Sequence, residues 1–455
     1  MSSMSQIGYS GIAAGQRGLH ASAQNVANLN TPGYSRLTTV TGSLAGPSSL
    51  SAGGGVEVSE VRRIVDDFKN RQLWHATTEM HRYKAAQEYL GSLECAMDSE
   101  GASVRTGLDQ FFAALSEASS RPADLPQRQQ VLDETKSLTQ CVNGLNSNID
   151  DQLKALRGQR SDIVNEINGL AGNLARLNKK VVETQSHGGD SSVLQDERDL
   201  LIGKLSQYVD IRVTEARTGA LSVSLADGLP MVSGHTAGQL SIMALAGGGQ
   251  EVSLSFIDSH FVLGQSALGG ALGGLHNVEH GELLEARERL GKMAQALTEM
   301  VNESQSRGYG LNGLVGLELL TCNPGNVTKL LQMNDLRPEG LAFADKPDEK
   351  GSNTVLLGMI ELKNKKVQIQ GNQVTLSEAF SSMLGQVASV SRCNQADLKT
   401  ATDVAMQAQA QRDSVSAVSD SEEALAIMDY SKTVQANMKV IQVDNELFGY
   451  LLACF

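Results

Sequence analysis

Hydrophobic and polar positions repeat with a helical period at both ends of this chain. Apolar or small residues recur at steps of three and four over residues 3–29 and again over 421–455. The N-terminal stripe consists of Met4, Ile7, Gly11, Ala14, Gly18 and Ala21, and the C-terminal one of Ile427, Ser431, Val434, Met438, Ile441, Asn445, Phe448 and Leu452. Each stripe predicts a helix with one face against a partner. Neither helix is stable alone, so we expect the two ends to pair with each other or with copies of themselves.

A longer helical pattern occupies residues 127–184 in the interior of the chain. Its apolar stripe keeps the spacing of three and four, with Arg160 as the one interruption. At about 1.5 Å per residue this helix is about 80 Å long, which predicts an elongated helical bundle. Residues 209–264 alternate with period two between glycine turns, which is typical of strands. The glycine-rich segment 41–59 is also β-leaning.

These patterns predict a mainly α fold with a small β-rich insert and with the terminal helices paired as a coiled coil. We expect three domains. A terminal-helix domain takes residues 1–50 and 415–455, a long helical-bundle domain takes 51–208 and 265–414, and an outer β domain takes 209–264.

The last helix has a second apolar stripe beside the first, so its final turns are apolar on more than one face. Such a surface requires a cover, either from neighbouring subunits or from a chaperone. The residues predicted to form this assembly and chaperone surface are Val434, Met438, Ile441, Val443, Leu447, Phe448 and Tyr450.

Composition and charge exclude several classes of function. Acidic residues outnumber basic ones by 51 to 38, which argues against nucleic-acid binding. No stretch of apolar residues is long enough to insert into a membrane, and the first thirty residues do not resemble a secretory signal peptide. The five scattered cysteines contain no CxxC pair and are interpreted as free thiols; they are Cys95, Cys141, Cys322, Cys393 and Cys454.

Two short motifs carry a possible chemistry. The segment from His276 through Glu279 to His280 matches HxxEH, in which two histidines on a helix bind zinc and the glutamate acts as a base. A zinc hydrolase is therefore one alternative, but the surrounding glycines make the helix doubtful. Residues 308–313 match GxGxxG, but they follow a helix instead of a strand, which indicates a loop. We predict no catalytic residue, no metal and no cofactor.

Residues 22–36, SAQNVANLNTPGYSR, resemble the N-terminal signature of bacterial flagellar axial proteins, the rod, hook and hook-associated family. The signature is long and contains little hydrophobic filler, so the match is specific. Its matching residues are Asn25, Asn28, Asn30, Thr31, Pro32, Gly33, Tyr34, Ser35 and Arg36.

Further segments resemble the hook–filament junction members of that family. They are VRRIVDDF at 61–68, RPADLPQRQQVL at 121–132, LQDERDL at 194–200 and QANMKVI at 435–441. Glu197 stands where glutamine is usual in the family, and the segment 416–423 departs from the usual start of the last helix.

The resemblance implies a structural, non-enzymatic flagellar protein at the junction of hook and filament, outside the cell. It implies export from the cytoplasm by the flagellar type III apparatus, a cytoplasmic export chaperone on the C-terminal helix, and ring assembly with copies of itself. The hook subunit and a second hook-associated junction protein are the further partners implied. A sibling rod or hook subunit is the second alternative, although the long helix at 127–184 favours the junction protein.

Overall fold

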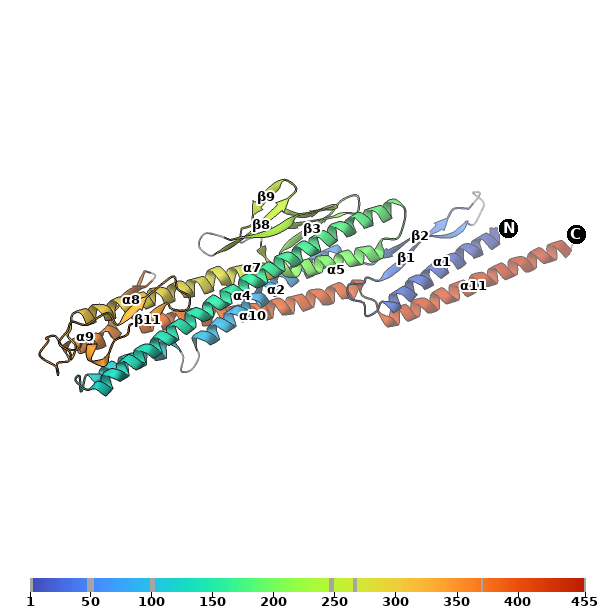
Figure 1. Cartoon of the computed structure of the whole chain (residues 1–455). Helices are drawn as coiled ribbons and strands as arrows, with labels where there is room; N and C mark the ends of the chain where they lie inside the picture. Colours follow the sequence, from blue (N-terminus) through green and yellow to red (C-terminus); the bar gives the residue numbers. More distant parts are fainter. Residues whose placement is uncertain are drawn as a thin grey trace. The chain divides into compact units, whose positions relative to one another are not determined.

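The structure of the chain is a computed structural model that describes residues 3–46, 53–98, 103–244, 249–264, 268–369 and 371–453. It is 64% helical, with long helices and a small β-rich region (Figure 1). The predicted mainly α class with a β insert is therefore confirmed. Within the described ranges, no helix combines the length and the hydropathy that a transmembrane span requires.

The chain divides into two compact units. Unit 1 contains residues 1–80, 164–270 and 401–455, and unit 2 contains residues 81–163 and 271–400. Long segments of three helices fall in each unit: α2 (Asp67–Met97), α4 (Leu125–Ser186) and α10 (Leu376–Ser416). The three-domain partition expected from the sequence stays a prediction.

Unit 1 contains both chain ends. Helix α1 (Ser3–Ala27) packs antiparallel to α11 (Asp420–Ala453), which confirms the predicted pairing of the two terminal helices. Strands β1 (Leu37–Leu44) and β2 (Gly55–Arg63) form an antiparallel hairpin that lies on α1. Ser10 on α1 accepts the Val56 amide of this hairpin at 3.0 Å.

Unit 1 also contains the predicted β insert, which follows helix α5 (Ser192–Tyr208). Its strands form two antiparallel sheets, ordered β3-β4-β5-β6 and β7-β8-β9. The strands are β3 (Ile211–Glu215), β4 (Leu221–Leu225), β5 (Pro230–Ser233), β6 (Thr236–Ala237), β7 (Gln239–Ala244), β8 (Gln250–Phe256) and β9 (Ser259–Val262). Alternate residues are buried, including Val223, Leu240 and Leu254, as the period of two predicts.

Asparagine side chains attach α4 to both sheets. Asn168 accepts the Leu240 amide at 2.7 Å and donates to the Leu240 carbonyl at 2.9 Å. Asn178 pairs in the same way with Leu221, at 3.2 and 2.7 Å. An asparagine amide carries a donor and an acceptor side by side. It can therefore bond to both the backbone N–H and the backbone C=O of one strand residue, as a neighbouring strand would.

Unit 2 is built around the N-terminal part of α4. Its other elements are α3 (Val104–Ala118), α7 (Gly270–Val278), the π-helical turn Glu279–Leu283, α8 (Leu284–Ser306), β10 (Leu320–Cys322), β11 (Leu331–Met333), the 3-10 turns Pro338–Gly340 and Leu362–Asn364, α9 (Thr354–Glu361), β12 (Val367–Ile369) and β13 (Asn372–Val374). The predicted stripe of α4 forms the core, with Leu138, Ile149, Leu153 and Leu156 at most 1% exposed.

The HxxEH segment is helical, so the doubt about its helix was wrong. His276 lies in the last turn of α7, which ends at Val278. The π-helical turn follows without a break and continues directly into α8. Gly281 lies in the π-turn and has open space around it. A glycine costs a helix only about 1 kcal/mol, and the buried leucines of α7 and α8 outweigh that cost.

The GxGxxG segment 308–313 lies in the loop after α8, as predicted. Cys95, Cys141, Cys322 and Cys393 are free thiols, in agreement with the sequence interpretation. Cys454 lies outside the described residues.

Candidate assembly site at the terminal helices

Glycines form the contact face of α1 against α11. A Cβ atom added to Gly8 would lie 2.7 Å from Ile441 Cγ1, and one added to Gly15 would lie 2.6 Å from Val434 Cγ2. Gly11 faces Asn437 and Gly18 faces Tyr430 with equally little room. The two helix backbones therefore approach more closely than any larger residue on this face of α1 would allow.

This seam agrees in part with the stripes expected from the sequence. On α1 it runs through Ser5, Gly8, Gly11, Gly15 and Gly18, so Gly11 and Gly18 of the expected stripe face α11, whereas Met4 and Ile7 are exposed. On α11 it runs through residues 430, 434, 437, 441 and 444, which include the expected Val434 and Ile441, while Met438, Phe448 and Leu452 are exposed. The expected stripes combined small and large residues, and the tight contact uses the small ones of α1.

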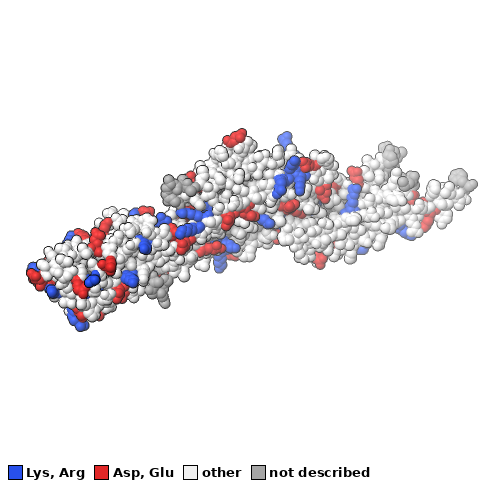
Figure 2. Space-filling model, in the orientation of Figure 1, with Lys and Arg blue, Asp and Glu red and all other residues white. Residues whose placement is uncertain are grey.

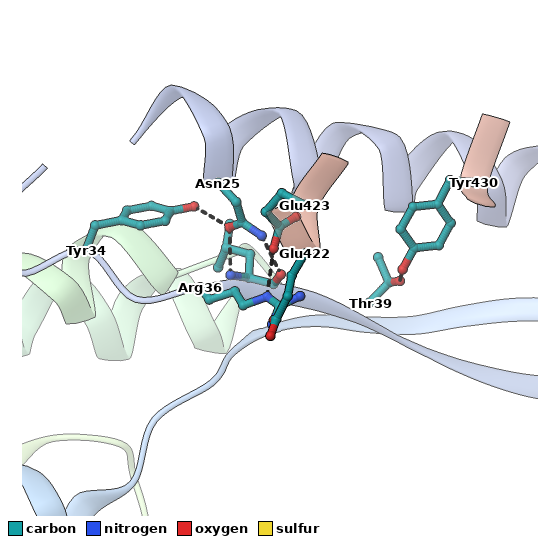
Figure 3. Close-up of polar contacts among 8 residues, drawn as sticks. Asn25, Tyr34, Arg36, Thr39, Glu422, Glu423 and Tyr430 are labelled. Atoms are coloured by element: carbon teal, nitrogen blue, oxygen red, sulfur yellow. Dashed lines mark hydrogen bonds and ion pairs between the residues drawn. The ribbon is translucent and has the colours of Figure 1, made fainter. Parts of the chain in front are cut away.

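Asn25, the first matching residue of the family signature, lies at the end of the helix pair (Figure 3). Its Nδ2 donates to the Leu37 carbonyl at 2.9 Å, and its Oδ1 accepts the Leu37 amide at 2.8 Å. The Tyr34 hydroxyl donates to the same Oδ1 at 2.9 Å. Because Asn25 is 1% exposed, these bonds fix the start of β1 to the last turns of α1.

The end of the signature is fixed to α11. Arg36 Nε lies 2.7 Å from Glu423 Oε1, and its Nη1 lies 2.5 Å from Glu422 Oε2. The Arg36 amide donates to the Ser416 carbonyl at 2.9 Å. Farther along α11, the Tyr430 hydroxyl lies 3.4 Å from Thr39 Oγ1 (Figure 3). The signature thus connects the turn after α1 with the start of α11.

Two further family-like segments meet at the same place. Asp196 of α5 accepts the Ser35 amide at 3.2 Å and pairs with Arg63 at 2.6 Å. Arg63 also pairs with Asp199 at 3.0 Å. The segments around residues 22–36, 61–68 and 194–200, which are far apart in the sequence, therefore form one polar cluster.

Burial and neighbouring carboxylates raise the pKa of Tyr34 to about 12, so its hydroxyl stays protonated and donates to Asn25. The other signature residues shape the turn. Thr31 Oγ1 donates to Asn28 Oδ1 at 3.1 Å, and Gly33 adopts a φ of +82° beside Leu200. Asn30 and Pro32 are exposed.

The outer face of α11 carries large apolar side chains that nothing in the described chain covers. Of the seven residues predicted for the assembly and chaperone surface, Val434 and Ile441 face α1. The other five are between 38% and 71% exposed; they are Met438, Val443, Leu447, Phe448 and Tyr450. Asp444 bonds to Ser5 near the start of α1, and α11 continues from there to Ala453.

The HxxEH residues form a different arrangement from a zinc site. Glu279 is fully buried and pairs with Arg157 at 2.8 Å and with Arg160 at 2.6 Å. The His276 and His280 rings stack with centroids 4.2 Å apart. No cluster of three potential metal ligands occurs among the described residues. Both ion pairs engage the Glu279 carboxylate inside the core, which argues against the hydrolase alternative.

The sequence did not indicate two parts of this site. The polar cluster of Ser35, Arg63 and Asp196 joins positions with no common period, so no pattern could have joined them. Gly8 lies outside the expected apolar and small-residue stripe of α1, although it faces Ile441 in the structure. Its role in the seam could have been inferred by giving this glycine, too, the weight of a contact residue.

Comparison with known proteins places the chain in a family. Residues 90–320, just over half of the chain, match the family described as the flagellar hook-associated protein FlgK helical domain. The flagellar hook-associated protein 1 of Escherichia coli is 28% identical over 326 residues, which cover 70% of this chain and 59% of that protein. The protein of that name from Bacillus subtilis is 22% identical, over 97% of this chain and 96% of its own.

A solved structure has a similar fold. The flagellar hook junction protein FlgK from Burkholderia pseudomallei matches with a TM-score of 0.67 and 15% sequence identity. The match covers 75% of this chain and 99% of that chain. The chain spans about three fifths of the length of the first curated relative that it matches, and almost the whole length of the Bacillus one.

Proposed function

Since this chain belongs to the FlgK family of flagellar hook-associated proteins, we propose that it is a structural subunit of the bacterial flagellum that joins the hook to the filament. It acts by assembly and not by catalysis. The observation that carries this proposal is the terminal helix pair. A glycine seam holds α1 to α11, while large apolar residues cover the outer face of α11.

Exposed apolar surface of this extent supports a role in binding other protein chains. Figure 2 shows few charged side chains over the terminal helices, in contrast to the interspersed charges elsewhere on the same face. Leu447, Phe448 and Tyr450 are each at least half exposed. Contiguous apolar surface on a soluble chain marks an interaction site, because its burial in a complex is favourable.

We propose that copies of the chain form a closed ring through this surface. A ring repeats one heterologous contact, so a face that is open in a single chain is covered in the assembly. The hook subunit and a second hook-associated junction protein are the proposed neighbours on either side of the ring. The protein acts outside the cell, at the hook–filament junction.

The same surface needs protection before assembly. We propose that a cytoplasmic export chaperone covers the C-terminal end of α11, where Leu447, Phe448 and Tyr450 are exposed. The flagellar type III apparatus then exports the chain. The chaperone leaves before assembly, because both partners require the same apolar residues.

The assembly role is tested in cells that lack the chromosomal copy. Wild type, Phe448→Asp and Lys439→Gln are supplied in trans, and filaments on hooks are counted by electron microscopy. We expect Phe448→Asp to abolish filaments while its helix still folds, because the residue is exposed in the single chain. Lys439→Gln changes an exposed polar position of the same helix and should leave filaments intact. Normal filaments without any copy of the protein would refute the junction role.

The chaperone role is tested separately by capture. Full-length protein and a version that ends at residue 420 are offered to the purified chaperone. We expect capture of the full-length chain alone. Equal capture of both would remove α11 from this role without affecting the assembly test.

A further inference from the structure

A pocket of about 430 Å³ lies within unit 1, where α2, α5 and the first β sheet come together. It is distinct from the terminal helix pair. Trp74, the single tryptophan of the chain, forms part of its wall together with Leu221. Arg71 of α2 and Arg198 of α5 also line it. The pocket thus combines an aromatic and aliphatic wall with three guanidinium groups, because Arg63 lines it too, and with the carboxylates of Asp67, Asp199 and Glu215.

Arg198 is buried, yet its hydrogen bonding is incomplete. The residue is 3% exposed, and its Nη1 donates to the Gly219 carbonyl at 2.8 Å. Its buried Nε has no hydrogen-bond acceptor within the described part of the chain, although the negative charges of Asp199, Glu215 and Asp67 act on its guanidinium. The adjacent Arg63 differs, because it pairs with both Asp196 and Asp199. A buried donor without an acceptor is unfavourable, so a ligand oxygen that accepts a hydrogen bond from Arg198 Nε would be favourable.

The pocket also reaches a free strand edge. In the sheet order β3-β4-β5-β6, strand β3 is an edge strand among the described residues. Three consecutive residues of β3, Val213, Thr214 and Glu215, line the pocket. Glu215 pairs with Leu221 across β3 and β4, so Val213, Glu215 and Leu221 share one face of the sheet, and the pocket lies against that face beside the edge strand. An edge strand offers backbone donors and acceptors to an extended peptide.

We propose that this pocket binds an extended peptide segment whose acidic side chain reaches Arg198. The peptide backbone pairs with the free edge of β3. The carboxylate accepts a hydrogen bond from Arg198 Nε and is also attracted by Arg71, and the side-chain stem packs against Trp74. The carboxylate of Asp199 is already paired with Arg63, while Asp67 and Glu215 are exposed, so the buried unpaired charge is positive.

Trp74 makes the test specific, since all tryptophan emission of the chain comes from the pocket wall. The full-length protein is titrated with the blocked peptide acetyl-Thr-Val-Glu-Val-Thr-amide, with its glutamine counterpart and with sodium acetate. We expect a saturable change in emission with the glutamate peptide. The glutamine peptide should bind at least about tenfold more weakly, because it lacks the charge that pairs with arginine.

Two exposed variants keep the test independent of folding at Arg198. Arg71→Gln should weaken the glutamate peptide several-fold, whereas Arg212→Gln, on the same strand but outside the pocket, should leave its affinity unchanged. No response to any probe, equal affinity for the two peptides, or full affinity in Arg71→Gln would overturn the proposal. So would an acetate midpoint equal to that of the peptide, which would indicate an adventitious ion only. None of these outcomes depends on the assembly role.

Discussion

Helix α4 in unit 2 and the α1–α11 pair in unit 1 bury very different side chains. Along α4, large aliphatic residues at each turn are almost fully buried, for example Leu138, Ile149 and Leu156. In α1 and α11, Ala21 and Val434 are the only buried hydrophobic residues within the described ranges. The remaining contact consists of glycines and polar groups.

This difference indicates where each region obtains its stability. Burial of a leucine or isoleucine contributes about 1.5–3 kcal/mol, so the stripe of α4 stabilises unit 2 from within the chain. The terminal pair gains close backbone packing but little apolar burial. Its large residues face outward, where neighbouring subunits could cover them. We infer that the bundle is self-sufficient and that the terminal pair is completed by assembly.

The largest effect is expected at the buried ion pair of unit 2. Glu279→Gln leaves the fully buried Arg160 without its counter-charge and should lower the free energy of unfolding by about 3–5 kcal/mol. The control Glu288→Gln removes an exposed pair with Lys292 and should cost about 0–1 kcal/mol. Urea denaturation followed by circular dichroism measures both. A double replacement of Arg160 and Glu279 by methionine should recover most of the loss, and its failure to do so would contradict the charge explanation.

A smaller effect is expected at the end of the terminal pair. Asn25→Ala leaves the buried amide and carbonyl of Leu37 without partners and should destabilise this region by about 1–3 kcal/mol. Limited proteolysis should release residues 1–46 faster, while unit 2 stays intact. Asn28→Ala is the control, because Asn28 bonds only within its own turn among the described residues. Equal proteolysis of the two variants would rule out the proposed anchoring by Asn25.

Replacing a glycine by alanine should change the stability of the chain differently in the two regions. Gly172→Ala in α4 meets nothing within 4 Å and should stabilise the chain by about 0.5–1 kcal/mol through helix propensity. Gly15→Ala gains the same propensity, but its Cβ would overlap Val434, and overpacking costs about 1–3 kcal/mol. Thermal unfolding should therefore shift upward for the first and downward, or not at all, for the second. Stabilisation by Gly15→Ala would contradict the close seam.

The smallest effect concerns pH. Burial, with His280 and Arg160 nearby, lowers the pKa of His276 to about 4. Above the usual value of 6.5 the ring is neutral in both the folded and the unfolded chain, but as the pH falls towards about 4 the unfolded chain takes up the proton first, so the folded chain loses stability. Glu282 works in the opposite direction, because burial raises its pKa to about 6. We therefore expect His276→Gln to lose less stability than wild type between about pH 7 and about pH 4.5. Parallel pH profiles would contradict the assignment.

Sequence periodicity predicted the helices and the β insert because buried apolar residues recur along the chain with the period of a helix or a strand. It placed the α4 stripe correctly, since large aliphatic residues occur there at every turn. It identified Gly11 and Gly18 of the α1 seam but missed Gly8, which leaves no hydrophobic signal. The polar cluster around Asp196 and Ser35 depends on chain crossings that have no period. The family signature marked the residues around Asn25 but did not reveal their partners.

Hydrogen exchange of the monomer and of isolated hook–filament particles tests the central claim most directly. In the monomer, the amides of α1 and α11 should exchange much faster than those of α4 in unit 2, because little apolar surface holds the terminal pair. In the particles, both terminal helices should become as protected as α4. Equal protection of α1 and α4 in a verified monomer, or unchanged exchange of α11 after assembly, would contradict the account.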